Sequence, residues 1–117
     1  MEIRKVVVIG SGTMGSGIAA HLCNAGVPVT LLDLTTEISE KARDRIHKSR
    51  PPLLIDKNKI NNINVGNIEE NFDVVKDADW VVEAVVERID IKHNIYEKIF
   101  KNRKKGAIVS SNTSSIP

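Results

Sequence analysis

The apolar and polar positions of the chain alternate between two periods, and each change of period marks a new element. Residues 3–9 are rich in β-branched side chains and stop at Gly10, which predicts a strand buried on both faces, as in a parallel sheet. The next apolar positions recur every fourth residue, which predicts a helix that ends near Gly26. That stripe consists of Met14, Ile18 and Leu22. Residues 27–32 form a second apolar run, so we expect a strand–helix–strand unit with a right-handed crossover.

The same alternation continues along the rest of the chain. We expect, in order, a polar helix over 35–50, a weak strand over 63–65, a helical turn over 72–75, a strand over 80–85, a helix over 91–100 and a strand over 107–110. Tyr96 and Phe100 accompany the isoleucine stripe of the last helix and are expected in the core. Because strands alternate with helices, we predict an α/β protein with a Rossmann-type, doubly wound parallel sheet of about five strands in the order 3-2-1-4-5.

Length and composition narrow the class of protein. With 117 residues the chain is long enough for one small domain, 1–117, and too short for two. Its 41% hydrophobic and 27% charged residues are typical of a soluble globule. A net charge of +2 and an aromatic content of 3% disfavour a nucleic-acid binder, and the short apolar runs disfavour a membrane span. The single cysteine, Cys23, disfavours a zinc module and fits a reducing compartment such as the cytoplasm.

The sharpest motif is Gly-Ser-Gly-Thr-Met-Gly, residues 10–15, between the first strand and the first helix. Gly10 permits a tight turn, Gly12 lets a pyrophosphate approach the bare backbone, and Gly15 lets the helix pack close to the strand. The helix N-terminus then offers free N–H groups and the positive end of its dipole to the phosphates. The alternative is a glycine-rich connection that binds nothing. The candidate cofactor-binding residues in this motif are Gly10, Gly12, Thr13, Met14 and Gly15.

An acid ends the second strand, 23 residues after the first glycine of the motif. At this place Asp33 is expected to accept a hydrogen bond from the 2′-hydroxyl of an adenosine ribose and to repel a 2′-phosphate. No arginine follows it directly, so NAD is favoured over NADP as the cofactor. The alternative role for Asp33 is to cap the following helix, although Thr35 or Thr36 could do so instead.

Three stretches resemble one family, the NAD-dependent 3-hydroxyacyl-CoA dehydrogenases. They are residues 10–19 (GSGTMGSGIA), 80–87 (WVVEAVVE) and 111–117 (SNTSSIP). The first is common among dinucleotide-binding folds, whereas the other two, in this order and spacing, are much more specific. Together they frame nearly the whole chain apart from residues 35–62. The resemblance implies an enzyme that oxidises a 3-hydroxyacyl-CoA to the 3-oxoacyl-CoA in fatty-acid β-oxidation or a related conversion.

The resemblance also implies roles for residues outside the glycine motif. Val85, Val86 and Glu87 would line the cofactor at the end of the fourth strand, with Glu87 near the nicotinamide ribose. Lys92, on the next helix, would also reach the cofactor. Ser114 would contact the nicotinamide and the substrate hydroxyl, as the catalytic-site residue of this chain, and Asn112 would support its loop.

Other features of the family are expected to be missing from this chain. The general-base histidine and its carboxylate partner follow the SNTSS stretch in the family, and His21, His47 and His93 match neither position. The helical substrate and dimerisation domain is also expected to be absent, so we expect 1–117 to be an NAD-binding domain that is incomplete at its C-terminal end. We therefore expect self-association through the open edge strand over 107–110 or through an apolar patch that the missing domain would cover. Beyond the acyl-CoA substrate we expect no metal, nucleic-acid or membrane partner.

Two alternatives remain open at this point. The chain could be a catalytically inactive NAD-binding remnant or module, because the histidine–carboxylate pair is missing. It could also be an S-adenosylmethionine-dependent methyltransferase, which shares a glycine-rich first turn and an acid after the second strand, although the complete glycine motif and the SNTSS stretch argue against this. The cations between residues 41 and 50 could meet CoA phosphates, but a solvated helix face is the commoner explanation for such a pattern.

Overall fold

A computed structural model describes residues 3–50, 52–85 and 89–111, the side chains of 89–93 excepted. The strands are β1 (Val6–Ile9), β2 (Val29–Asp33), β3 (Ile63–Asn67), β4 (Trp80–Glu83) and β5 (Ile108–Ser111). The α-helices are α1 (Thr13–Asn24), α2 (Thr36–Lys48) and α3 (Ile89–Asn102), and two short 3-10 helices are η1 (Lys57–Asn62) and η2 (Phe72–Asp77). Each element that the sequence predicts is present, with ends that differ by a few residues. None of the described helices combines the length and the apolar character that a membrane-spanning helix needs.

All five strands belong to one parallel sheet in the order β3-β2-β1-β4-β5, which confirms the predicted fold class. In the register, Ile9 pairs with Leu32 of β2 and with Glu83 of β4. The chain order reverses between β1 and β4, so the carboxyl ends of these strands form the crevice in which open α/β sheets bind their ligands.

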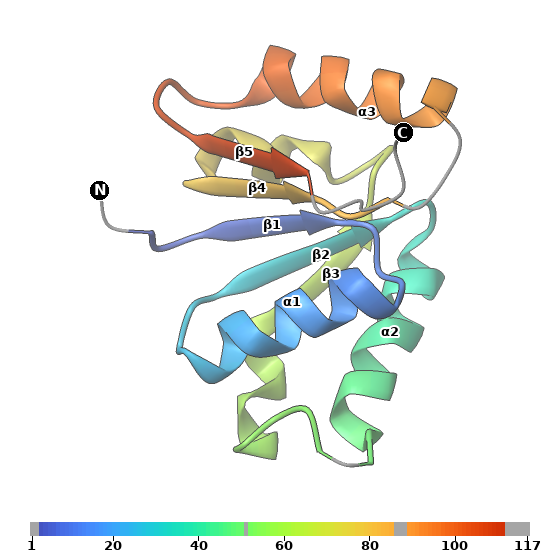
Figure 1. The fold of residues 1–117 in the computed structure, drawn as a ribbon, viewed down its shortest axis with the longest axis vertical. Helices are drawn as coiled ribbons and strands as arrows, with labels where there is room; N and C mark the ends of the chain where they lie inside the picture. Colours follow the sequence, from blue (N-terminus) through green and yellow to red (C-terminus); the bar gives the residue numbers. More distant parts are fainter. Residues whose placement is uncertain (1–2, 51, 86–88, 112–117) are drawn as a thin grey trace.

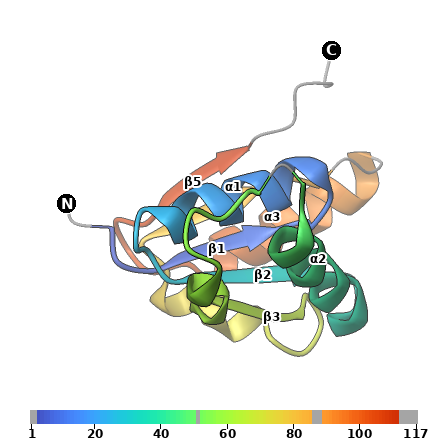
Figure 2. The same ribbon diagram turned by 90° about the horizontal axis from the view of Figure 1, so that it is seen from below.

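The molecule has three layers, with helices on both faces of the sheet (Figure 1). Helices α1 and α2 cover one face, in front of β1 and β2 in Figure 2, and α3 covers the other. Helix α1 turns its small residues most directly toward the sheet, while Ile18 and Leu22 of the predicted stripe are partly buried and pack against the same cluster. Its buried residues are Gly15, Ser16, Ala19, Ala20 and Cys23. Small side chains let the helix approach the strands closely, whereas Met14 is 38% exposed at the helix N-terminus.

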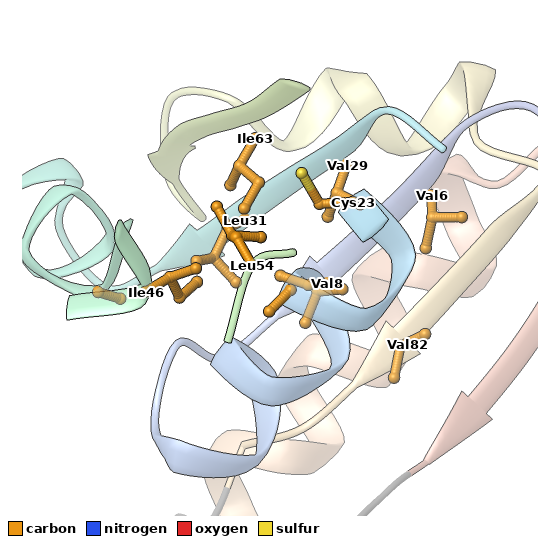
Figure 3. Close-up of a cluster of buried hydrophobic side chains, with 12 residues drawn as sticks. Val6, Val8, Cys23, Val29, Leu31, Ile46, Leu54, Ile63 and Val82 are labelled. Atoms are coloured by element: carbon orange, nitrogen blue, oxygen red, sulfur yellow. The ribbon is translucent and has the colours of Figure 1, made fainter. Parts of the chain in front are cut away.

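Alternate residues of β1 enter two separate hydrophobic clusters. Val6 and Val8 face α1 and α2, while Val7 and Ile9 face α3 and η2. Figure 3 shows the first cluster, in which Cys23 of α1 lies beside Val29 of β2. Because both faces of the central strand are buried, its sequence is a continuous apolar run.

One aromatic residue lies outside the core that the spacing predicted for it. Ile95 and Ile99 of α3 are buried, but Phe100 is 56% exposed. Phe100 follows the buried stripe by one position, about 100° around the helix, and so faces solvent. Its ring is 5.0 Å from the guanidinium carbon of Arg103 and 6.3 Å from the ring of Tyr96.

Candidate functional site

The chain turns sharply between β1 and α1, and two glycines make this turn possible. Gly10 has a φ of +106°, a conformation that L side chains rarely adopt, and its N–H donates to the carbonyl oxygen of Leu32 at 2.8 Å. A Cβ on Gly10 would lie 2.7 Å from the carbonyl oxygen of Ala84. A Cβ on Gly15 would lie only 1.7 Å from the carbonyl oxygen of Gly10. The turn and the first turn of α1 are therefore in contact, and both positions require glycine.

Gly12 serves a different purpose, because the space beside it is open. Among the described residues, and apart from Gly12 itself and its two chain neighbours, no atom lies within 4 Å of the position that its Cβ would take. Its φ of −68° is also ordinary, so neither packing nor backbone strain demands glycine here. The missing side chain instead exposes the backbone of the turn to the crevice, where a large anion could approach it.

The N-terminus of α1 carries no compensating group of its own. Within residues 3–50, no side chain caps α1 and its first turn holds no acid. By contrast, Thr35 caps α2 by accepting the N–H of Ile38 at 3.2 Å, and Glu37 lies in that first turn. The first N–H groups of a helix have no partner within the helix, and its positive dipole end attracts anions. These features of α1 and the open space at Gly12 fit a pyrophosphate.

Asp33 lies next to this turn, at the carboxyl end of β2. Its Oδ2 accepts the backbone N–H of Ser11 at 2.7 Å and the Ser11 hydroxyl at 2.5 Å, and its Oδ1 accepts the N–H of Leu34 at 2.7 Å. A carboxylate has about four acceptor positions, which leaves one for an incoming hydroxyl. Because Thr35 caps α2, the alternative role of Asp33 as the helix cap is wrong.

The turn, the acid and an apolar wall enclose one pocket of about 280 Å³. The lining residues from the turn and the acid are Gly10, Ser11, Gly12 and Asp33. The apolar lining residues are Leu34, Ile38, Ile68, Ala84, Val85 and Ile95, and α2 adds Arg45. A pocket with a mostly apolar wall and a few convergent polar groups is typical of a small-molecule or cofactor site.

A buried acid lies at the end of β4. Glu83 is 0% exposed, and its carboxylate accepts the N–H of Val85 at 2.5 Å, the Tyr96 hydroxyl at 3.1 Å and the Ser111 hydroxyl at 2.9 Å. Burial, and the charge of Glu83, raise the pKa of the Tyr96 hydroxyl, despite an opposing hydrogen bond from Ser111. The network ties β4, α3 and β5 together beside the pocket. The sequence signal that could have identified Glu83 is a charged residue within an apolar strand.

The described structure covers only part of the predicted site. It brings together the glycine turn, Asp33 and Val85 around the pocket. Lys92 lies in α3, but its side chain is outside the described part, and Val86, Glu87, Asn112 and Ser114 are also outside it. Of the histidines, His21 and His47 are exposed. Arg45 is exposed, as expected for a solvated helix face, but it also lines the pocket. In the described part of the chain, no cluster of three His, Cys, Asp or Glu residues could hold a metal ion.

Comparison with known proteins relates this chain to enzymes of fatty-acid oxidation. The family model described as "3-hydroxyacyl-CoA dehydrogenase, NAD binding domain" matches residues 5–117. A Deinococcus radiodurans protein described as a 3-hydroxyacyl-CoA dehydrogenase is 44% identical over all of this chain and 36% of its own length. A Rickettsia felis protein described as a fatty acid oxidation complex trifunctional enzyme is also 44% identical, over 99% of this chain and 17% of its own length.

A solved structure agrees with the sequence relatives. The (S)-3-hydroxybutyryl-CoA dehydrogenase PaaH1 of Ralstonia eutropha superposes with a TM-score of 0.80 at 32% identity, over 98% of this chain and 42% of that one. This chain therefore spans less than half the length of each of these three proteins. The match to the family model over residues 5–117 shows that the chain belongs to the NAD-binding domains of the 3-hydroxyacyl-CoA dehydrogenase family.

Proposed function

We propose that this chain binds NAD in the pocket between β1, β2 and β4, and that it serves an enzyme that oxidises 3-hydroxyacyl-CoA to 3-oxoacyl-CoA. The observation that carries the proposal is the pairing of the α1 N-terminus, which no described side chain caps and which is open at Gly12, with Asp33 in the wall of the same pocket. The turn offers N–H groups to the pyrophosphate, and Asp33 offers a carboxylate oxygen to the adenosine ribose. Thr13 and Met14, in the first turn of α1, complete this side of the proposed site.

The cofactor half of the proposal has a direct test. Isothermal titration of the chain with NAD, NADP and S-adenosylmethionine should give binding of NAD, weaker binding of NADP and no competition from S-adenosylmethionine. Equal affinities for NAD and NADP would contradict the role of Asp33. Displacement of NAD by S-adenosylmethionine would favour the methyltransferase alternative.

The substrate half follows from the relatives. Bound NAD supplies a nicotinamide ring that accepts a hydride from the carbon bearing the substrate hydroxyl. In our proposal, this chain binds and orients the dinucleotide, while Ser114, with Asn112 supporting its loop, contacts the substrate hydroxyl. Val86, Glu87 and Lys92 would hold the nicotinamide ribose and its surroundings, next to Val85 in the pocket wall. The general base that takes the hydroxyl proton would be a histidine on the substrate domain.

The alternative of an inactive NAD-binding module is distinguishable by activity. The enzyme that contains this domain should oxidise NADH when acetoacetyl-CoA is added, which is the reverse of the proposed reaction. NAD binding without any turnover in that protein would favour the inactive module. Turnover that Asp33→Ala weakens, through a higher KM for NADH, would support the enzyme and this pocket together.

Location and assembly are further parts of the proposal. A cytoplasmic location suits the free, buried thiol of Cys23, which a reducing compartment would leave unmodified. Self-association is proposed through β5, the last strand in the sheet order, where Ile108 is 44% exposed. An edge strand offers unpaired backbone groups to a second copy.

A further inference from the structure

The Arg45 side chain reaches the glycine turn, although the residue lies in the last turn of a charged helix. Arg45 is exposed, yet its Nη2 donates to the carbonyl oxygen of Ser11 at 3.2 Å. The Ser16 hydroxyl donates to the same carbonyl at 2.9 Å, so the acceptor is held from two sides. This contact directs the Arg45 side chain toward the glycine turn and into the wall of the pocket that contains Asp33.

Ser11 connects Arg45 to the acid of the pocket. Its N–H and hydroxyl donate to Asp33, while its carbonyl accepts from Arg45. Among the described residues that line the pocket, Asp33 is the acid and Arg45 is the cation. Both side chains therefore hydrogen-bond to Ser11 and line the same pocket, and they carry opposite charges.

The positive charge of Arg45 is available to a ligand. The described residues include no ion pair between Arg45 and Asp33, and the donors to Asp33 among them are neutral groups of Ser11 and Leu34. A guanidinium has five N–H donors, and the structure shows one of them in use, at Ser11. The remaining donors suit a phosphate, which arginine binds through two parallel hydrogen bonds.

We propose that Arg45 is a second determinant of cofactor choice and would bind a phosphate on the adenosine ribose. This inference rests on the proposed NAD pocket. Asp33 repels a 2′-phosphate, whereas a nearby arginine accommodates one, so the two residues act in opposite directions on NADP. In the native chain the acid dominates and NAD is preferred. Removing the charge of Asp33 leaves Arg45 free to select the 2′-phosphate.

The test is a double-mutant cycle on Asp33 and Arg45, with NAD and NADP titrated calorimetrically into each variant. Asp33→Asn preserves an amide oxygen for the Ser11 donors and should bind NADP about tenfold more tightly than the native chain does. Adding Arg45→Gln to that variant should remove most of this gain. Adding Lys41→Gln instead should not, because Lys41 carries the same charge on the same helix but pairs with Glu37 at 3.2 Å, away from the pocket lining.

The outcomes separate this inference from the proposed function. Equal NADP affinity of Asp33→Asn with and without Arg45→Gln would overturn the role of Arg45, as would an absence of any NADP gain in Asp33→Asn. Circular dichroism of each variant confirms that it is folded. If the native chain binds NAD normally in these titrations, the proposed function survives either result. Failure of the folded native chain to bind NAD would instead overturn the pocket itself.

Discussion

A methyl group added to Gly15 would collide with the backbone of the turn that precedes α1. Its Cβ would lie 1.7 Å from the carbonyl oxygen of Gly10, whereas real Cβ contacts essentially never fall under 3.0 Å, so the two must separate by at least 1.3 Å. The obstacle is backbone, which cannot rotate away as a side chain can. Overpacking of this kind costs about 3 kcal/mol, a large part of a typical free energy of unfolding of about 5–15 kcal/mol.

Two neighbouring glycines provide matched controls, because the same substitution meets nothing at either of them. Gly17→Ala, in the same helix, should stabilise the chain by about 0.5–1 kcal/mol through helix propensity. Gly12→Ala should change stability by only about 0.5 kcal/mol, since the helix N-cap tolerates alanine slightly less well than glycine. Its methyl group would nevertheless occupy the space of the pyrophosphate and weaken NAD binding by more than about tenfold.

Urea denaturation followed by circular dichroism measures the first effect, and calorimetric titration with NAD measures the second. We expect Gly15→Ala to lose stability and NAD binding together, Gly12→Ala to lose binding alone, and Gly17→Ala to lose neither. A Gly15→Ala chain as stable as the native one would refute the packing argument. A Gly12→Ala chain that binds NAD normally would refute the position of the pyrophosphate.

Three further predictions concern pH and assembly. A hydrogen bond from Lys104, with backbone N–H donors, lowers the pKa of Asp79 from 3.8 to about 2; the stability it contributes is present above pH 3.8 and is lost as the pH falls toward 2. Asp79→Asn should therefore be less stable than the native chain at neutral pH and should lose less stability as the pH falls. An equal loss of stability in acid by the two chains would contradict this. Because the pKa of Tyr96 is raised in the folded chain, the stability that its protonated hydroxyl contributes is present below pH 10 and is lost as the pH rises through the pKa of the folded state. Tyr96→Phe should therefore reduce the loss of stability at alkaline pH, which urea unfolding at several pH values measures. Ile108→Lys should shift self-associated chains toward monomer in light scattering, because it places a charge on the β5 edge; a native chain that is monomeric at high concentration would rule out that interface.

The sequence predicted the sheet well because its signals are local. Buried parallel strands are continuous apolar runs, and the glycine motif indicates where a helix follows a strand. The inward face of α1 was harder to predict, because Ala19 and Ala20 give a weaker periodic signal than Met14 and Ile18. Their burial depends on how closely the helix approaches the sheet, which is a tertiary property.

The candidate site was predictable where its binding residues lie in one strand–turn–helix–strand segment, as the glycine turn and Asp33 do. Arg45 and Glu83 were not predictable in this way, since each acquires its role from a distant partner. Arg45 reaches Ser11, 34 positions earlier in the chain, and Glu83 accepts from Ser111, 28 positions later. Only the topology, which places α2 beside the turn and β5 beside β4, brings these groups together.

A crystal structure of the chain with NAD bound would test the central claim most directly. We predict that the diphosphate lies over Gly12 at the N-terminus of α1, and that a carboxylate oxygen of Asp33 accepts a hydroxyl of the adenosine ribose. A dinucleotide bound elsewhere, or one whose ribose makes no contact with Asp33, would contradict the account.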